Sequence, residues 1–283
     1  MEIRPYSPGS EFYIESLTRE PGWQMSYLHY HDLYELYFLE QGHHSTIIED
    51  KLFQLSPKDV ALYTPNILHK SHNTNGYSRT CIYFTSDYLK KYFSLTAIDT
   101  LTECFKTPVI SLDDDTFAQI RKIFPLIKAE NLKAEGNCAF MYLTAILAIL
   151  NRNKNSYRPI QLSQEQEKLT LVLRYIHQNY NSIDSISEIA SQLYVTKYHL
   201  CHTFKAATGL TLIEYINHIK IRQACNLLKC TKKSVTQIGA DCGFNSPMYF
   251  CKTFKKLMGT APSEFRKSLQ QGHKDTPPAA GPS

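Results

Sequence analysis

The sequence predicts an α+β protein of two domains, an N-terminal β-barrel followed by two helices, and then an all-α domain. Residues 1–110 are rich in aromatic and β-branched residues and are broken by short turn signals, which is typical of many short strands. Beyond Asp113, apolar residues recur at every third or fourth position, as on one face of a helix. At roughly 150 residues per domain, a chain of 283 residues is also expected to form two domains.

Short segments with two-residue alternation define the strands that we expect in the first domain. Turn-forming residues such as Gly42 and Pro57 separate them. The predicted strands are residues 25–31, 35–40, 45–48, 60–63 and 80–84. Strands of this length and spacing suit a small sandwich or barrel.

Two helices are predicted after the strands. Phe117, Ile120 and Phe124 lie on one face of the first, and residues 138–150 of the second are apolar on almost every side. Such a helix needs cover on more than one face, which a partner subunit would provide. We therefore expect a β-barrel over residues 1–110, a helical dimerisation element over 111–152, a polar linker over 153–163, an all-α domain over 164–268 and a disordered tail over 269–283.

Charge is distributed unevenly along the chain. The net charge is +5, but residues 164–271 contribute +7 and residues 1–163 contribute −2. A basic domain joined to a slightly acidic one is typical of a polyanion-binding domain linked to a sensing or assembly domain. A solvated, lysine-rich surface is the alternative explanation. Eight cysteines without a Cys-x-x-Cys pair predict reduced, mostly buried thiols. The absence of a signal peptide or a 20-residue apolar run predicts a cytosolic protein without membrane contact.

The basic part of the chain contains an internal repeat. Phe204-Lys205 and Gly209 recur fifty residues later as Phe254-Lys255 and Gly259. A short amphipathic segment precedes each copy, at residues 186–193 and 235–242. This order of helix, turn and helix occurs twice, framed by longer helices expected at residues 164–180 and 212–228.

Capping residues support this reading of the repeat. Gly243 supplies the positive φ that a tight turn needs, Ser246 is a suitable N-cap, and Pro247 occupies the first helical position. Thr196 is the expected cap in the first copy. A plain helical bundle would show the same periodicity, but the charge of +7 favours DNA binding.

Residues 168–267 resemble the C-terminal domain of AraC/XylS-type transcription regulators. The resemblance rests on a long set of matching residues: Ile189-Ala190, Leu200, Phe204-Lys205, Gly209, Ala224, Leu227-Leu228, Ile238, Gly243-Phe244, Tyr249-Phe250, Phe254-Lys255-Lys256, Gly259, Pro262 and Phe265-Arg266. It implies about seven helices, with two recognition helices in successive major grooves of double-stranded DNA. The chain departs from the pattern at Tyr194, where glycine is usual, at Gly239, where alanine is usual, and at Lys220, where arginine is usual.

Position along each recognition helix selects the residues expected to meet DNA. Apolar residues such as Leu200 and Phe250 belong to the core, and the DNA-binding candidates lie off that stripe. They are Lys197, Tyr198, Cys201, His202 and Lys205 in the first helix, and Pro247, Met248, Tyr249, Cys251 and Lys252 in the second. We expect Lys252 to read a base and His202 to contact a phosphate.

The N-terminal part resembles the cupin-like sensor domain of the same family. His29-Tyr30-His31, Glu35, Gly42, Pro65, His69 and Asn73 follow most of the cupin motif. In metal-binding cupins the residues matching His29, His31, Glu35 and His69 ligate iron, manganese or zinc. Lys58 and Ile67 replace glycines of the second motif. We therefore favour hydrogen-bonding or rim histidines without a cofactor, and keep a divalent metal as the alternative.

Aromatic residues would line the same pocket. The ligand-binding candidates are Trp23, Tyr27, Tyr37, Tyr63 and Tyr83, together with His29, His31, Glu35 and His69. Aromatic faces with a few polar groups suit a sugar or another small polar ligand. The alternative is that most of these tyrosines only fill a small barrel.

Taken together, these features predict a cytosolic, homodimeric transcription regulator and no enzyme activity. Family resemblance implies an activator that contacts RNA polymerase and responds to a small-molecule effector. Two alternatives remain open. A cupin metalloenzyme, an isomerase or dioxygenase, would show stoichiometric metal and turnover. An architectural DNA-binding protein would bind every duplex with equal affinity at fixed salt.

Overall fold

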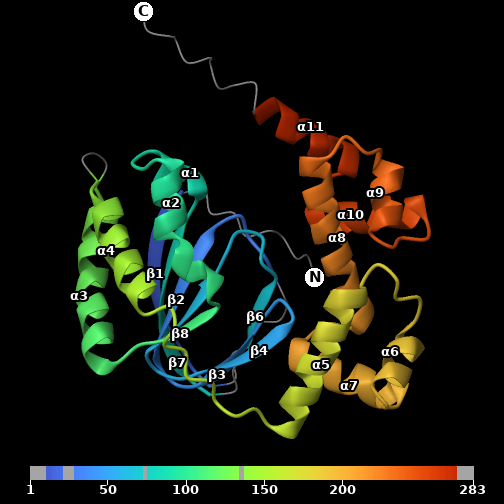
Figure 1. Ribbon diagram of the computed structural model, residues 1–283, viewed down its shortest axis with the longest axis horizontal. Helices are drawn as coiled ribbons and strands as arrows, with labels where there is room; N and C mark the ends of the chain where they lie inside the picture. Colours follow the sequence, from blue (N-terminus) through green and yellow to red (C-terminus); the bar gives the residue numbers. More distant parts are fainter. Residues whose placement is uncertain (1–10, 22–28, 73–74, 134–136, 273–283) are drawn as a thin grey trace, which may run out of the picture. The chain divides into compact units, whose positions relative to one another are not determined.

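The computed structural model describes residues 11–21, 29–72, 75–133 and 137–272 (Figure 1). Within them the chain forms two compact units, residues 11–170 and residues 171–272. In the described residues, no helix has both the length and the apolar composition needed to cross a membrane.

The first unit contains two antiparallel sheets. The larger has the strand order β1, β7, β2, β5, β8, and the smaller has the order β4, β3, β6. The strands are β1 Phe12–Arg19, β2 Tyr34–Gln41, β3 His44–Ile48, β4 Lys51–Leu55, β5 Asp59–Tyr63, β6 His69–His72, β7 Tyr77–Phe84 and β8 Val109–Ser111. Glu35 on β2 lies opposite Tyr63 on β5 and Tyr83 on β7. Directly opposite residues share a face of the sheet, so Glu35 lies between two tyrosines.

Four of the five predicted strands are confirmed as β2, β3, β5 and β7. The prediction missed β1, β4, β6 and β8. Of the predicted strand at 25–31, residues 25–28 lie outside the described residues. The rest of that prediction is wrong, because His29 forms only an isolated bridge with His69, and Tyr30 and His31 lie outside any strand.

Residues 86–106 are helical, which corrects the expectation of strands throughout residues 1–110. They form α1 (Ser86–Lys90), α2 (Leu95–Leu101) and a 3₁₀-helix (Glu103–Lys106). Side chains cap both α-helices: Thr85 accepts a hydrogen bond from the Tyr88 amide, and Ser94 accepts one from the Ala97 amide. These caps satisfy amides that would otherwise lack a partner at each helix start.

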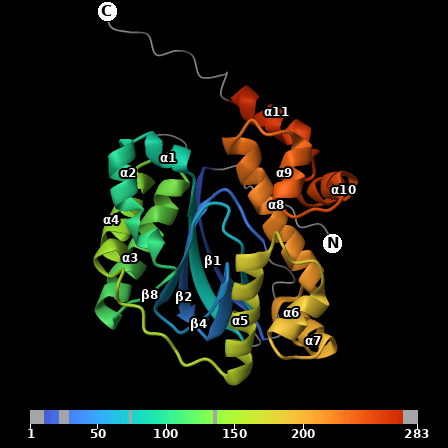
Figure 2. The ribbon, with the colours of Figure 1, turned by 45° about the vertical axis from the view of Figure 1, so that its right-hand side comes forward.

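The two predicted long helices are confirmed as α3 (Asp114–Asn131) and α4 (Ala139–Arg152). They lie side by side on one face of the larger sheet (Figures 1 and 2). The apolar core between them includes Phe38, Ile82, Ile120 and Ile146. The chain itself therefore covers much of the apolar surface of α4, and Met141 remains 59% exposed.

The opposite face of the larger sheet points to the interior between the two sheets. A second core cluster there joins Tyr37, Tyr63 and Tyr83 to Ile48 and Leu55 of the smaller sheet. One sheet thus separates an apolar, helix-covered core from an interior rich in tyrosine.

The second unit is helical. Counting α5, which begins just before residue 171, the helices are α5 Gln164–Asn179, α6 Ile186–Gln192, α7 Lys197–Thr208, α8 Leu212–Cys230, α9 Val235–Asp241, α10 Pro247–Met258 and α11 Pro262–Gly272. This matches the implied seven helices, and α8 contacts α7 as well as α9 and α10. α11 continues to Gly272, so the expected disordered tail from residue 269 is wrong for its first four residues; residues 273–283 lie outside the described residues.

The thiols agree only in part with the prediction. None of the eight cysteines, all of which lie in the described residues, forms a disulfide. Cys81, Cys104, Cys225 and Cys242 are buried, whereas the other four are half-buried or exposed. The expectation of mostly buried thiols therefore holds for half of them. Cys251, for example, is exposed because it lies on the outer face of α10.

Candidate ligand site and nucleic-acid interface

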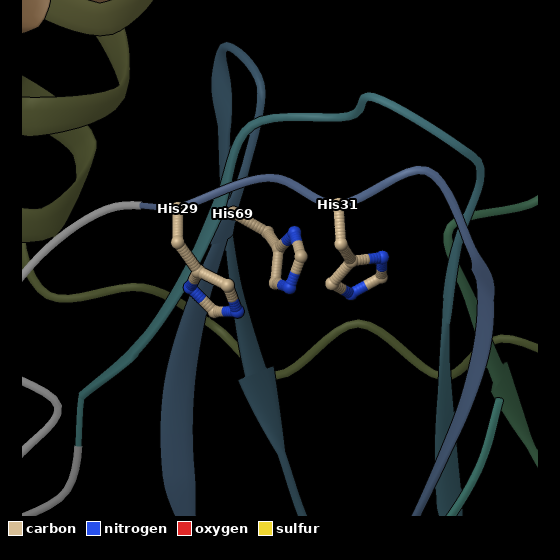
Figure 3. Close-up of side chains that lie close together, drawn as sticks. All are labelled: His29, His31 and His69. Atoms are coloured by element: carbon tan, nitrogen blue, oxygen red, sulfur yellow. The ribbon is translucent and has the colours of Figure 1, made fainter. Parts of the chain in front are cut away.

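Three histidines come together in the first unit (Figure 3). His29 and His31 belong to the segment that precedes β2, and His69 begins β6. The backbone joins these segments: the His29 amide donates to the His69 carbonyl at 3.0 Å, and the His69 amide donates to the His29 carbonyl at 2.9 Å. The imidazoles therefore project side by side from two paired segments.

The side chains of the cluster lie within contact distance of one another. Ring centroids are 4.1 Å apart for His29 and His69 and 5.0 Å apart for His31 and His69. Glu35 Oε2 lies 2.9 Å from His31 Nε2 and 3.5 Å from His69 Nε2. Glu35, His31 and His69 are buried, and His29 is half-buried. Four of the predicted ligand-binding residues thus converge.

Backbone carbonyls orient two of the rings. His31 Nδ1 is 3.0 Å from the Leu33 carbonyl, and His69 Nδ1 is 3.0 Å from the Ile67 carbonyl. A carbonyl only accepts hydrogen bonds, so each Nδ1 bears the hydrogen. Nε2 is then the nitrogen that each ring directs towards Glu35, and His31 Nε2 is hydrogen-bonded to it.

Burial and hydrogen bonding set the charges of the cluster. Burial lowers the pKa of His69. It also lowers the pKa of His29, to well below its usual range. Burial also raises the pKa of Glu35, but the hydrogen bond with His31 and the proximity of His69 outweigh burial and hold this pKa well below its usual range. An ionised Glu35 therefore faces a neutral His69. At 3.5 Å, the two share no strong hydrogen bond.

The residue types at this position fit a divalent metal ion. The ligand atoms of His29, His31 and His69 all lie within 4.8 Å of one another. Imidazoles that bind metals commonly donate their other N–H to a carbonyl, as His31 and His69 do. Zinc–nitrogen bonds of about 2.0–2.1 Å would require the rings to close further.

Tyrosines surround the cluster unevenly. The Tyr63 ring stacks on His69 with centroids 4.1 Å apart, and the Tyr83 ring meets His31 edge-on at 5.9 Å. Tyr37 instead contacts His44 at 5.2 Å. The predicted candidates Trp23 and Tyr27 lie outside the described residues. Tyr63 and Tyr83 are thus brought to the cluster, and Tyr37 is part of its wider surroundings.

Sequence reasoning missed Arg79, which points into the same interior. Its Nη2 lies 2.8 Å from Glu15 Oε1, and its guanidinium lies 5.3 Å from the Tyr37 ring centre. Two-residue alternation along β7 places Arg79 on the same face as Cys81 and Tyr83, and this signal would have found it.

The second unit presents two capped helices with polar outer faces. Leu200 and Phe204 of α7, and Phe250 and Phe254 of α10, are buried. Every predicted DNA-binding residue lies outside this core: Lys197, Tyr198, His202, Lys205, Pro247, Met248, Tyr249, Cys251 and Lys252 are exposed, and Cys201 is half-buried. Tyr198 and His202 stack with ring centres 6.2 Å apart.

Two side chains of α8 fix the position of α10, and the sequence did not identify their roles. Asn217 Nδ2 donates to the Tyr249 hydroxyl at 2.9 Å. Lys220 Nζ donates to the Gly243 carbonyl at 2.6 Å and lies 5.5 Å from the Phe244 ring centre. The lysine that replaces the usual arginine thus holds the turn before α10.

Comparison with known protein families agrees with this architecture. The AraC-like ligand-binding domain family matches residues 13–138, and a helix-turn-helix domain family matches residues 189–268. This chain belongs to the AraC family of DNA-binding transcription regulators.

Relatives of this AraC-family chain match it over different lengths. An uncharacterised HTH-type transcriptional regulator of Bacillus subtilis, YfiF, is 25% identical over 94% of this chain and 86% of its own length. The transcriptional activator RhaS of Mannheimia succiniciproducens is 26% identical over 84% of this chain and 88% of its own. The MmsAB operon regulatory protein of Pseudomonas aeruginosa is 33% identical, over 35% of this chain and 32% of its own length.

Proposed function

We propose that this AraC-family regulator is an activator controlled by a small ligand with hydroxyl groups, such as a sugar, bound at His29, His31, Glu35 and His69. The supporting observation is the gap of 3.5 Å between His69 Nε2 and Glu35 Oε2, two acceptors without a hydrogen between them. A ligand hydroxyl would supply the missing donor. Buried acceptors gain free energy when a donor reaches them.

The surroundings of the cluster suit such a ligand. Tyr63 and Tyr83 offer aromatic surface beside His69 and His31. Flat aromatic faces pack against the C–H groups of a ligand while its hydroxyls bond to the polar groups. His29 is the half-buried member, so the ligand approaches the cluster from the side of His29.

The regulatory action follows from the second unit and from the relatives. Two exposed, basic helices bind double-stranded DNA, and an activator then contacts RNA polymerase in the cytoplasm. The named activator among the relatives supports the positive mode of control. Exposed apolar residues on α3, at its C-cap and on α4 support a homodimer: Leu126, Leu132 and Met141 are 46%, 87% and 59% exposed.

The test replaces single histidines in the full chain. A panel of monosaccharides and polyols is screened for a rise in melting temperature, since binding to the native state stabilises it. His69→Ala should abolish the rise for any hit, and DNA affinity without ligand should stay within about twofold. His43→Ala is the matched control, because His43 is exposed and its ring contacts Ser56, which is not part of the cluster. A hit that stabilises His69→Ala as much as wild type would contradict the proposal.

A divalent metal ion at the same cluster is the second candidate. Its support is the convergence of three imidazoles, two of which already donate Nδ1–H to carbonyls. Protein purified without chelator or nickel resin would then contain close to one equivalent of iron, manganese or zinc, and His31→Ala would lose it. Less than a tenth of an equivalent would exclude a tightly held ion. Turnover in addition to metal would indicate a cupin enzyme.

A further inference from the structure

Tyr194 occupies a backbone conformation that usually needs glycine. It lies in the turn between α6 and α7 with φ of 54°. The turn closes through the Val195 amide, which donates to the Ala190 carbonyl at 3.0 Å. The turn between α9 and α10 has the same closure around Gly243, with φ of 77° and a 3.0 Å hydrogen bond from the Phe244 amide to the Gly239 carbonyl. A β-carbon in this left-handed region costs free energy, which glycine avoids.

Packing does not compensate for this cost. The Tyr194 side chain is 96% exposed. The other non-glycine residues with positive φ in the described ranges, Glu49, Lys58 and Asn66, are all half-buried. Strained residues persist where the surroundings or a function require them. An exposed aromatic ring held in a strained turn therefore needs an explanation outside the protein core.

The position of the turn points to DNA. Tyr194 lies two residues before Thr196, the N-cap of α7, and Lys197 and Tyr198 at the start of that helix are exposed. In helix-turn-helix proteins the N-terminal end of the recognition helix contacts base edges in the major groove. The turn before it then lies beside the sugar-phosphate backbone, where tyrosine hydroxyls commonly bond to phosphate oxygens.

We propose that Tyr194 is a DNA-backbone contact, whose phenol hydroxyl donates to a phosphate at the edge of the groove that α7 enters. This inference rests on the assignment of α7 as a recognition helix. The left-handed turn directs the ring away from the protein, and the contact adds affinity without reading sequence. The turn between α9 and α10 has no equivalent side chain, because a β-carbon at Gly243 would lie 2.2 Å from the Asn181 carbonyl oxygen.

The experiment compares three variants of the full chain. The DNA is a duplex selected from a random library by the wild-type protein. Tyr194→Gly should raise the melting temperature by about 2–4 °C, because strain is relieved. It should also weaken binding about 5–10-fold, equally on the selected duplex and on duplexes with one base pair changed. Tyr194→Asn, which tolerates positive φ, should lose the same affinity.

Tyr194→Phe decides which group makes the contact. It keeps the ring and the strain but removes the hydroxyl, and it should lose as much affinity as Tyr194→Gly. Full affinity in Tyr194→Phe would overturn the assignment of the hydroxyl. Tyr92→Phe, which changes another exposed tyrosine, controls for nonspecific effects.

A companion variant separates this inference from the function of α7. Lys197→Ala removes a charge from the first turn of α7. If Lys197→Ala weakens binding and Tyr194→Gly does not, the proposal for Tyr194 is wrong. If neither variant weakens binding, α7 does not meet DNA, and the assignment of this recognition helix fails together with the inference.

Discussion

The helix-turn-helix unit of α6 and α7 and that of α9 and α10 end alike but turn differently. Gly209 and Gly259 stop the two recognition helices with φ of 74° and 76°. In each case the glycine amide donates to a lysine carbonyl one turn earlier. The stops agree because each recognition helix must end at a left-handed residue before the chain continues into α8 or α11.

The turns differ by one residue. Ile189 of the first unit corresponds to Ile238, 49 residues later, whereas Leu200 corresponds to Phe250, 50 residues later. The extra residue lies between Gly243 and the cap Ser246. The turn between α9 and α10 is packed against Asn181 and held by Lys220. In the turn between α6 and α7, Tyr194 faces solvent. Changes in the second turn should therefore alter stability, and changes in the first should mainly alter binding.

The largest expected effect is on the second turn. Gly243→Ala should lower the free energy of unfolding by about 2–4 kcal/mol, because its β-carbon would lie 2.2 Å from the Asn181 carbonyl oxygen and φ is positive. Tyr194→Ala in the first turn keeps the same strain at an exposed site and should change stability by less than about 0.5 kcal/mol. Urea unfolding of the full chain measures both. Equal losses would show that the turns do not differ in packing.

A smaller effect is expected where the first helix of each unit meets its recognition helix. A β-carbon at Gly239 would lie 2.8 Å from Cδ1 of the fully buried Phe250. Gly239→Ala should therefore destabilise the protein by about 1–3 kcal/mol, although alanine is the better helix former. The reciprocal change on α6, Ala190→Gly, should lower the free energy of unfolding by about 1 kcal/mol. A stabilised Gly239→Ala protein would contradict the close contact.

The stability that α8 contributes should depend on pH. Burial lowers the pKa of His218 on α8 to about 4, and Glu214 and Lys256 are the charged groups that act on it. Because this value lies below the unfolded pKa of about 6.5, the unfolded chain binds more protons between these pH values. Stability contributed by neutral His218 is complete above pH 6.5 and decreases as pH falls towards 4, by about 1 kcal/mol at pH 5.5.

Replacement of two histidines tests this pH dependence. Unfolding of His218→Gln and wild type is compared at pH 7.5 and pH 5.5. The loss of stability on acidification should be smaller in the variant. His202→Gln changes an exposed histidine of α7 and should leave the wild-type pH dependence unaltered. Equal acid sensitivity in wild type and His218→Gln would show that His218 does not titrate as described.

Local signals in the sequence predicted much of the helical unit. Gly243, Ser246 and Pro247 each have a conformational preference that acts within a few residues, so the turn and the start of α10 were predictable. Thr85 and Ser94 have the same capping preference, but the surrounding aromatic and β-branched residues favoured strands. Caps alone therefore did not outweigh composition in residues 86–106.

Contacts between distant segments were harder to predict from the sequence. The cupin-like spacing indicated that His29, His31, Glu35 and His69 would converge. It did not show that carbonyls of Leu33 and Ile67 orient two of the rings. The bond from Asn217 to Tyr249 joins residues on two helices, and no local pattern encodes it. Such pairs depend on how the helices pack.

We expect α7 and α10 each to enter a major groove of the same DNA. Interference footprinting of the full chain on a selected duplex tests this expectation. We predict two patches of guanine contact about 10 base pairs apart. Lys252→Ala should remove contact within one patch and relax discrimination at one base pair there. His202→Ala should weaken the other patch on all sequences, as loss of a phosphate contact would. A single patch, or equal affinity for every duplex at fixed salt, would show that the two helices do not read DNA in this way.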